Sequence, residues 1–388
     1  MSQPRDLLEG LLKIYSPSYH ERDAVDYLVA QMSAAGLHAF RDEAGNAVGM
    51  TSPPNPLSYE ERGKTSPSSS LSYEERGETS PPSPRSHMER GKVRDIVMLG
   101  HIDTHPGFVE VRRDGDVLYG RGAVDAKGPL CAFASAAARV GARDGWRIVV
   151  VGAVEEECPT SKGAHFAKTQ YSPTYAMVGE PSGWDRVTLG YKGSLWLEYT
   201  LTRDNAHSAG QARSANEDAV EFWLRIKSYA DAFNADKIKV FDKLDPTLRG
   251  MNSENDGLHE TARLVIGLRL PSDITVAGLE ETLLEMADDA QLKFDTETPA
   301  YRAEKNNALV RAFLSSIREG GGTPGFTLKT GTSDMNVVGP HWTCPIVTYG
   351  PGDSNLDHTP NEHIDLNEYD KAIDVLARVL ETLMTDGG

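Results

Sequence analysis

The sequence predicts an α/β sandwich with a second, smaller α+β unit inserted into it. In the first half, apolar strand patterns at residues 97–100 and 148–154 alternate with an alanine-rich helical pattern at residues 130–140, which is typical of strand–helix–strand units. After residue 180, alternating strand and helix patterns favour a separate layered unit of the β-α-β-β-α-β type. The 388 residues, 39% hydrophobic and 25% charged, suit a globular protein of two domains.

Two helices and a pair of strands open the chain. Residues 6–14 and 21–35 have helical spacing of apolar side chains, and Gly36 supplies a C-cap to the second helix. Residues 37–50 then predict a strand, a turn and a strand.

A repeated segment interrupts this pattern. Three copies of a 14-residue unit, TSPPNPLSYEERGK, TSPSSSLSYEERGE and TSPPSPRSHMERGK, begin at Thr51, Thr65 and Thr79. A solenoid is the alternative, but each copy offers too few apolar side chains to offset an ordering entropy of roughly 1–2 kcal/mol per residue. We therefore expect residues 51–92 to be a disordered insertion between two strands, remote from the chemistry; a docking tail is the functional alternative.

The first candidate site residues follow an apolar strand. VMLGHID ends in His101 and Asp103, and residues two apart in a strand lie on the same face. An imidazole with a carboxylate behind it is a common arrangement for metal binding. Asp125 follows in the small-residue turn GAVDAKG. A structural role is the alternative for an isolated His-x-Asp.

Further carboxylates follow other apolar strands. Glu155, Glu156 and Glu157 come directly after residues 148–154, and Glu180 follows residues 175–178. Adjacent carboxylates repel one another unless cations neutralise them, although a plain acidic loop is possible. His358, with Asn361 and Glu362 behind it, adds a second imidazole near the C-terminus. Two His and several carboxylates at strand ends favour a bridged pair of Zn²⁺ ions.

These motifs resemble the co-catalytic zinc amidohydrolases that include acetylornithine deacetylase, succinyl-diaminopimelate desuccinylase, aminoacylase and carboxypeptidase G. The likeness extends from the N-terminus to about Ala377, apart from the insertion. It implies a zinc-peptidase-like catalytic sandwich, formed by residues 1–190 and 299–388, with an inserted ferredoxin-like lid and dimerisation domain at residues 191–298.

The resemblance also implies a ligand set for two Zn²⁺ ions per subunit, which Co²⁺ can replace. His101 and Glu180 would bind one ion and Glu157 and His358 the other. Asp125 would bridge them and be followed by a cis peptide to Ala126.

Further roles come from the same resemblance. Asp103 would orient His101, and Glu156 would be the general base. Because Glu155 stands where the family has Asp, the register across the three glutamates is uncertain by one residue. His207, on the lid of a homodimer partner, would stabilise the oxyanion. Gly331, Thr332 and Ser333, together with Asp334, resemble the family's loop for the substrate carboxylate.

The remaining elements complete the predicted fold. In the inserted unit we expect one edge strand at residues 187–202, helices at 217–233 and 274–287, and strands at 262–271 and 291–298, with residues 236–260 as connections. Helices at residues 307–319 and 366–384 return to the sandwich.

Charge and composition narrow the function classes. The 40 basic and 57 acidic residues give a net charge of −17, which disfavours nucleic acid and anionic membranes as partners. The chain has no apolar run of the roughly 20 residues that a membrane span needs. The first residues lack a signal-peptide pattern, and three cysteines cannot all pair. We therefore expect a cytoplasmic protein.

The motif runs GRGAVDAKGPL, GEPSGWD and KTGTSDMNV look most like one branch of the family, which releases lysine or ornithine from the C-terminal glutamate of a small acidic amino-group carrier protein in lysine and arginine biosynthesis. A basic rim should then face the carrier, and candidates are Arg112, Arg113, Lys162, Lys168, Arg186, Lys192 and Lys329. The alternatives are an N-acetylornithine or N-acetyl-lysine deacetylase, a dipeptidase, or a non-catalytic metal-binding protein.

Overall fold

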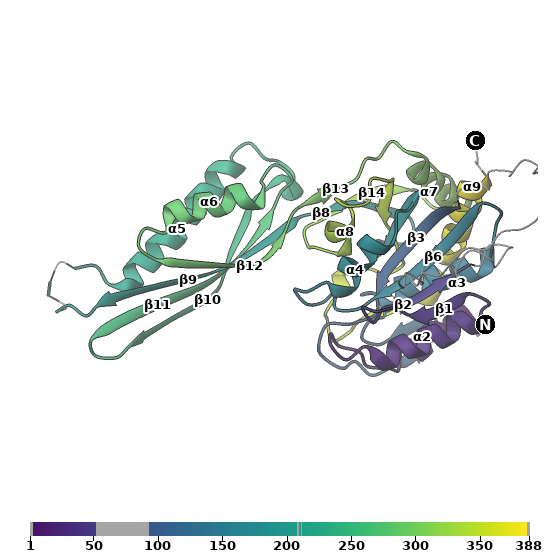
Figure 1. The fold of residues 1–388 in the computed structure, drawn as a ribbon, viewed down its shortest axis with the longest axis horizontal. Helices are drawn as coiled ribbons and strands as arrows, with labels where there is room; N and C mark the ends of the chain where they lie inside the picture. The colour runs from purple at the N-terminus through teal and green to yellow at the C-terminus, as the bar shows by residue number, and fades with distance from the viewer. Residues whose placement is uncertain (1–2, 52–92, 208, 211, 386–388) are drawn as a thin grey trace, which may run out of the picture.

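The computed structural model describes residues 3–51, 93–207, 209–210 and 212–385 (Figure 1). Among them, a nine-stranded sheet contains, in spatial order, β1 (His38–Arg41), β2 (Ala47–Met50), β6 (Trp146–Ala153), β3 (Arg94–His101), β7 (Tyr175–Gly179), β15 (Ile346–Thr348), β8 (Arg186–Tyr191) and β13 (Tyr301–Arg302), with β14 (Gly325–Lys329) paired to β8.

The middle of this sheet is parallel. Strand β3 pairs in parallel with β6 on one side and with β7 on the other. These strands are almost continuously apolar because both faces of the sheet are covered. The carboxyl ends of all three strands therefore meet at one edge of the sheet.

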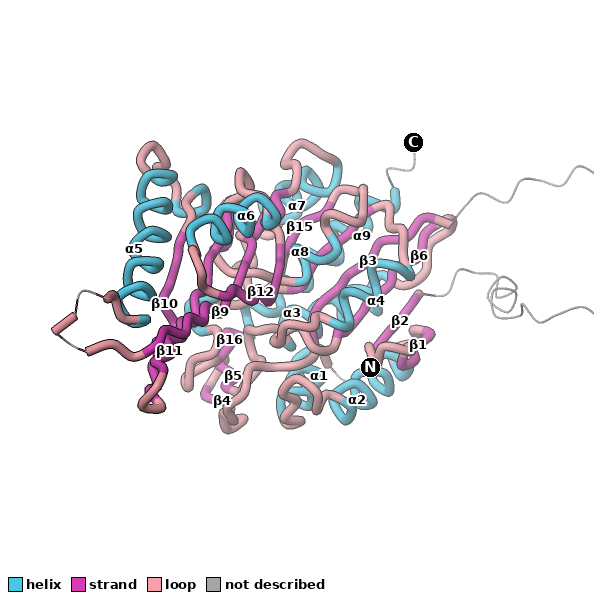
Figure 2. Tube along the Cα trace, turned by 60° about the vertical axis from the view of Figure 1, so that its left-hand side comes forward, coloured by secondary structure: helices cyan, strands magenta, loops and turns pink. Residues whose placement is uncertain are grey.

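Helices cover both faces of the sheet, so the predicted sandwich is confirmed (Figure 2). One core combines side chains such as Met98 and Val150 with helices α1 (Pro4–Leu12), α2 (Arg22–Ala34), α3 (Lys127–Val140), α7 (Ala308–Glu319) and α9 (Leu366–Thr385). The alternate side chains, such as Val97 and Val149, face α4 (Lys162–Gln170) and α8 (Asp334–Val338). The alternation follows from the two-residue period of a strand.

The inserted unit, which we call the lid, has its own sheet and core. Its elements are β9 (Gly193–Asp204), α5 (Ala215–Asn234), β10 (Asp245–Asn255), β11 (His259–Leu270), α6 (Val276–Met286) and β12 (Gln291–Thr298). The four strands lie in the order β10-β11-β9-β12, and both helices cover one face of them (Figure 1). Leu197, Phe222 and Ile266 belong to the core between them. The predicted β-α-β-β-α-β unit is confirmed.

Two details of the lid were predicted wrongly. The alternating stretch at residues 187–202 is not one edge strand: it divides at Lys192 into β8, in the large sheet, and β9, an inner strand of the lid. Alternation continues through the break, so the pattern does not reveal a change of sheet. Residues 236–260 contain strand β10, which forms a hairpin with β11. The limits of the domains at residues 190 and 298 stay predictions.

The remaining elements are short. A small sheet contains β16 (His363–Asp365), β5 (Val117–Tyr119) and β4 (Arg112–Asp114), and two 3₁₀ turns lie at Val240–Asp242 and Ser354–Leu356. The predicted helix pair and strand pair at the start of the chain are confirmed. None of the helices in the described ranges has the length and apolar character that crossing a membrane requires.

The predicted insertion lies outside the described residues except for Thr51. That residue is buried and belongs to the sheet: its N–H donates to the Ile148 carbonyl at 3.0 Å, and its hydroxyl accepts from the Ile148 N–H at 2.9 Å. Strand β6 lies between β2 and β3, so the two strands that flank the insertion are not neighbours. A short turn could join them only if they were neighbours, so the expected simple hairpin connection is wrong.

Replacing residues 52–92 by a flexible linker of four residues should leave the melting temperature nearly unchanged. The linker must pass over β6, a span of about two strand spacings or 10 Å, and four extended residues reach about 13 Å. Thermal unfolding and turnover, measured beside the full chain, check this. A deletion that also removes Thr51 is the control and should melt at a lower temperature. A loss of activity at an unchanged melting temperature would show that the repeats take part in catalysis or binding.

Candidate active site

The candidate site lies where the three parallel strands end. His101 is the last residue of β3, Glu155 to Glu157 follow β6, and Glu180 follows β7. In open α/β sheets, ligands bind outside the carboxyl ends of the strands. His101 and Glu180 are 79 residues apart in the sequence. The order of the strands in the sheet brings them to the same edge.

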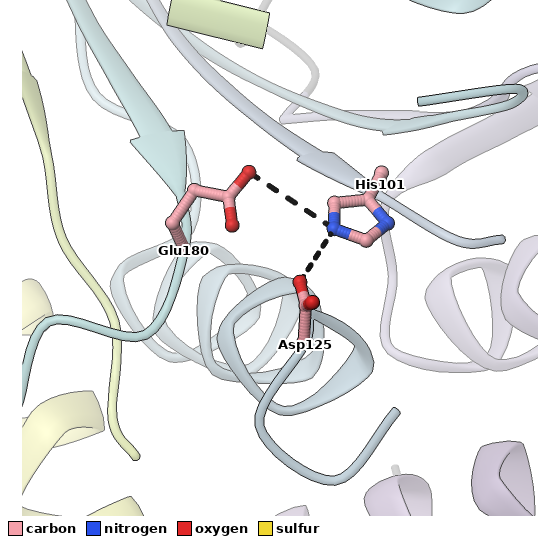
Figure 3. A group of neighbouring side chains, drawn as sticks. All are labelled: His101, Asp125 and Glu180. Carbon is pink, nitrogen blue, oxygen red and sulfur yellow. Dashed lines mark hydrogen bonds and ion pairs between the residues drawn. The ribbon is translucent and has the colours of Figure 1, made fainter. Parts of the chain in front are cut away.

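One group of possible metal ligands contains His101, Asp125 and Glu180 (Figure 3). The His101 Nε2 atom lies 3.2 Å from Asp125 Oδ1 and 4.0 Å from Glu180 Oε1. All three residues are buried. Their ligand atoms lie close enough together to hold one cation.

A second group contains Asp125, Glu157 and His358. The His358 Nε2 atom lies 3.0 Å from Asp125 Oδ2 and 3.1 Å from Glu157 Oε2. Asp125 therefore directs one oxygen to each histidine, as a bridging carboxylate would. The peptide from Asp125 to Ala126 is cis, as the resemblance implied.

The charges of the site oppose one another. Burial raises the pKa values of Glu156 and Glu180 well above their usual range; His101 counteracts this and neighbouring carboxylates add to it. Burial would also raise the pKa of Asp125, but hydrogen bonds with His101 and His358 lower it below its ordinary value. Hydrogen bonds with Asp125 and Glu157 raise the pKa of His358 to about 10. These shifts favour protons on the buried carboxyl groups unless cations balance their charge.

The three consecutive glutamates point to different places. Glu155 adopts a positive φ of 62° and its Oε2 accepts from the Thr160 hydroxyl at 2.6 Å, away from both ligand groups. Glu157 contacts His358. Glu156 belongs to neither group, and its Oε2 lies 3.9 Å from His101 Nε2. This arrangement supports the register in which Glu156 is the base and Glu157 the ligand.

Asp103 contacts the site differently from the expectation. The oxygen nearest to His101 Nδ1 is the Asp103 backbone carbonyl, at 2.9 Å, whereas the carboxylate Oδ1 is 3.5 Å away. The carboxylate instead accepts from the backbone N–H groups of Glu156 and Glu157, at 3.1 and 3.0 Å, and from the Ser18 hydroxyl. Asp103 therefore holds the glutamate loop as well as lying beside His101.

Glu362 supports the other loop in a similar way. It is fully buried and accepts from the backbone N–H groups of Val124 and Asp125, at 3.1 and 3.2 Å. Arg121 donates to its second oxygen at 2.7 Å. The sequence analysis named Glu362 only as a neighbour of His358 and missed Arg121, because no local pattern links positions 241 residues apart.

A cavity of about 790 Å³ opens beside both ligand groups and is lined by the lid as well as the sandwich. Gly331, Thr332 and Ser333 line it, as expected, but the Ser333 hydroxyl is used to cap α8 by accepting from the Met335 N–H. Two cations also line it, Lys329 and the lid residue Arg269. Burial lowers the pKa of both. Arg269 was missed because an isolated arginine in an alternating strand reads as exposed to solvent.

Other predicted residues lie elsewhere. His207 is exposed on the loop between β9 and α5 and does not line the cavity of its own chain. Lys192 is fully buried, so its assignment to a basic rim is wrong. His105 stacks on His358 with a centroid distance of 4.2 Å but belongs to neither ligand group.

Comparisons with known proteins agree with this geometry. The chain is 40% identical over 388 residues to a LysW-lysine hydrolase of Deinococcus radiodurans, covering 98% of this chain and 97% of that protein. It is 28% identical over 293 residues to a LysW-lysine/LysW-ornithine hydrolase of Sulfurisphaera tokodaii, covering 74% and 81%.

Solved structures share the fold. An M20 family metallo-carboxypeptidase of Sulfolobus solfataricus superposes with a TM-score of 0.72 at 17% identity, covering 99% of this chain and 100% of that chain. A dinuclear metal-binding M20 peptidase of Bacillus subtilis has a TM-score of 0.70 at 10% identity, covering 98% of each chain. The model of Peptidase family M20/M25/M40 matches residues 97–382. Because this family model spans most of the chain and the Deinococcus radiodurans relative matches over almost its whole length, the chain belongs to Peptidase family M20/M25/M40.

Proposed function

We propose that this chain hydrolyses the amide bond that joins L-lysine or L-ornithine to the C-terminal glutamate of a LysW-type carrier protein. The name of the Deinococcus radiodurans relative, which matches over almost the whole chain, supports this substrate, and so does the name of the Sulfurisphaera tokodaii relative, which matches over 74% of the chain. The proposed reaction type rests on one observation: the two candidate ligand groups share Asp125, and Glu156, which belongs to neither group, lies beside them.

We further propose that the two groups hold two zinc ions, which cobalt can replace. Histidine nitrogen and carboxylate oxygen are the donors that catalytic zinc prefers besides thiolate. The excess of buried carboxylates in the site also fits two bound zinc ions, because the repulsion between the carboxylates falls when cations bind. Bound divalent cations polarise a scissile carbonyl and lower the pKa of water.

The chain's own groups would move the proton and hold the substrate. Glu156 would take a proton from water and later give it to the leaving amine. Arg269 and Lys329 present positive charge in the cavity. Together with the nearby Thr332 and Gly331, they would bind the carboxylate of the substrate. Arg112 and Arg113, both exposed, are the surface cations that we propose for an acidic carrier.

His207 would act in trans within a homodimer. Its side chain is exposed, and its Nδ1 accepts a hydrogen bond from the Ala209 N–H at 3.1 Å. An imidazole on a lid tip can reach a neighbouring subunit's site, where it would stabilise the developing oxyanion.

The substrate proposal is tested by incubating the enzyme with lysine-loaded carrier and with N-acetylornithine side by side. We expect release of lysine from the carrier, slowing as salt rises, because charge attraction between exposed groups is screened over ~10 Å at 0.1 M. A small γ-glutamyl-lysine peptide is the control for chemistry without docking. Efficient turnover of acetylornithine with none of the carrier would assign a deacetylase instead.

Changing Glu156 to Gln should reduce kcat by about 10³-fold or more while two metal ions stay bound, because the amide cannot accept the proton of water. Glu157→Gln is the matched control and should lose metal. Metal content by mass spectrometry and initial rates decide between them. Metal loss in Glu156→Gln but not in Glu157→Gln would shift the register by one residue.

Mixing two inactive variants tests His207. Glu156→Gln lacks the base and His207→Ala lacks the oxyanion donor, so each homodimer should be inactive. In a randomly re-assembled mixture, half the dimers are mixed and each has one intact site, so about a quarter of wild-type activity should return if His207 acts in trans. A mixture that stays inactive after proven subunit exchange would contradict this role.

Removing the metal should abolish activity without unfolding the protein, because the large core does not depend on the ligands. The metal-free protein should lose stability as pH rises. The pKa of His358 is about 10 in the folded protein, against an ordinary 6.5. Protonated His358 therefore contributes fully to the free energy of unfolding below pH 6.5, and this contribution is lost as the pH rises through about 10. Calorimetry of chelated and metal-loaded protein checks this, and His358→Asn should flatten the slope. Global unfolding on chelation at pH 7 would contradict it.

A further inference from the structure

Two short connectors join the lid to the sandwich. Lys192 alone separates β8 from β9, and Pro299 with Ala300 separates β12 from β13. The connectors touch: a Cβ added at Gly193 would lie 2.5 Å from the Thr298 carbonyl oxygen and 2.6 Å from the Ala300 nitrogen. The orientation of the lid is therefore decided at one place.

The side-chain amide of Asn336 holds both connectors at that place. This residue of α8 is 2% exposed. Its Nδ2 donates to the Lys192 carbonyl at 3.1 Å and to the Pro299 carbonyl at 2.8 Å. Its Oδ1 accepts from the Ser333 N–H at 2.9 Å. These three partners fix the orientation of the amide, because the reverse orientation would set oxygen against two carbonyls.

Lys192 is anchored to both sides of the junction. Its backbone N–H donates to the Lys329 carbonyl in the sandwich at 3.1 Å. Its fully buried ammonium reaches the lid, donating to the carbonyls of Val240 and Lys243 and to the Asp245 carboxylate. A shift at this residue would therefore be transmitted to both parts of the chain.

The same amide is connected to the cavity. The Asn336 amide oxygen accepts a hydrogen bond from the Ser333 N–H, and Ser333 directly follows Thr332. The lid residue Arg269 donates to the Thr332 hydroxyl at 3.5 Å. All the possible metal ligands belong to the sandwich, whereas Trp196, Arg269 and Asp295 line the cavity from the lid. The angle of the lid thus sets where Arg269 lies relative to the reacting groups.

We propose that Asn336 is a positioning residue. It ties the two connectors to the substrate loop at residues 330–333, so that the angle of the lid and the conformation of that loop are set together. This deepens the proposed function, on which it rests for its substrate. Asn336 acts through Arg269 and the loop, and touches no reacting atom.

The test is Asn336→Asp, which keeps the shape and the acceptor for the Ser333 N–H but loses both donors. We expect KM to rise about tenfold while kcat stays within about threefold, because the binding group Arg269 moves with the lid of its own chain, whereas Glu156 stays on the sandwich. Asn307→Asp is the matched control: its Oδ1 accepts from the Val310 N–H and its Nδ2 donates to the Glu304 carbonyl, yet it touches neither connector. It should leave KM unchanged.

A double-mutant cycle separates positioning from a general loss of stability. If Asn336 acts through Arg269, adding Asn336→Asp to Arg269→Gln should raise KM much less than it does alone. An additive effect, an unchanged KM, or an equal fall of kcat with loss of metal would overturn the proposal. Should Asn336→Asp not fold, Asn336→Ala removes the donors without adding charge and takes its place.

Small-angle X-ray scattering provides a measurement that needs no substrate. The maximum dimension should change in Asn336→Asp and not in Asn307→Asp; an unchanged scattering curve would overturn the proposal. If the carrier conjugate is not turned over by the unmodified enzyme, the proposed substrate fails, while scattering still decides the role of Asn336.

Discussion

The convergence of three parallel strand ends gathers negative charge in a buried place, and the rest of the site follows from that constraint. Glu156, Glu180 and Asp125 surround His101 at the carboxyl edge of the sheet. Desolvation and mutual repulsion make these acids costly while they are ionised and unpaired. The fold holds them there because Glu156 and Glu180 come shortly after the core strands β6 and β7, and Asp125 lies just before helix α3, which packs in the same core.

Two further buried acids keep these loops in place. Asp103 accepts the N–H groups of Glu156 and Glu157, and Glu362 accepts those of Val124 and Asp125. In each loop a charged carboxylate accepts hydrogen bonds from the backbone N–H groups of the residues that carry the site side chains. These hydrogen bonds hold the backbone and so fix the direction in which the side chains point. Carboxylates thus form the candidate ligand groups on one side of the backbone and support the backbone from the other.

The sequence predicts most of the ligand groups because strand ends are local features. An apolar run that stops at His101 or before Glu155 can be recognised without knowledge of the fold, and the resemblance supplied the pairing of ligands. The contacts of Asp103, Arg121 and Arg269 could not be predicted, since each depends on which segments come together in space. The division at Lys192 was missed for the same reason: alternation describes one strand but not the sheet to which it belongs.

The place of the insertion has a consequence for how the chain can change over evolution. Thr51 and Arg94 lie at the amino-terminal edge of β6 and β3, whereas the ligands lie at the opposite edge, about 23 Å away along eight residues of strand. Duplication or deletion of a 14-residue unit adds or removes one whole copy between two fixed anchor points. A change in the number of copies therefore leaves both anchor points, and with them the register of β2, β6 and β3, where they are.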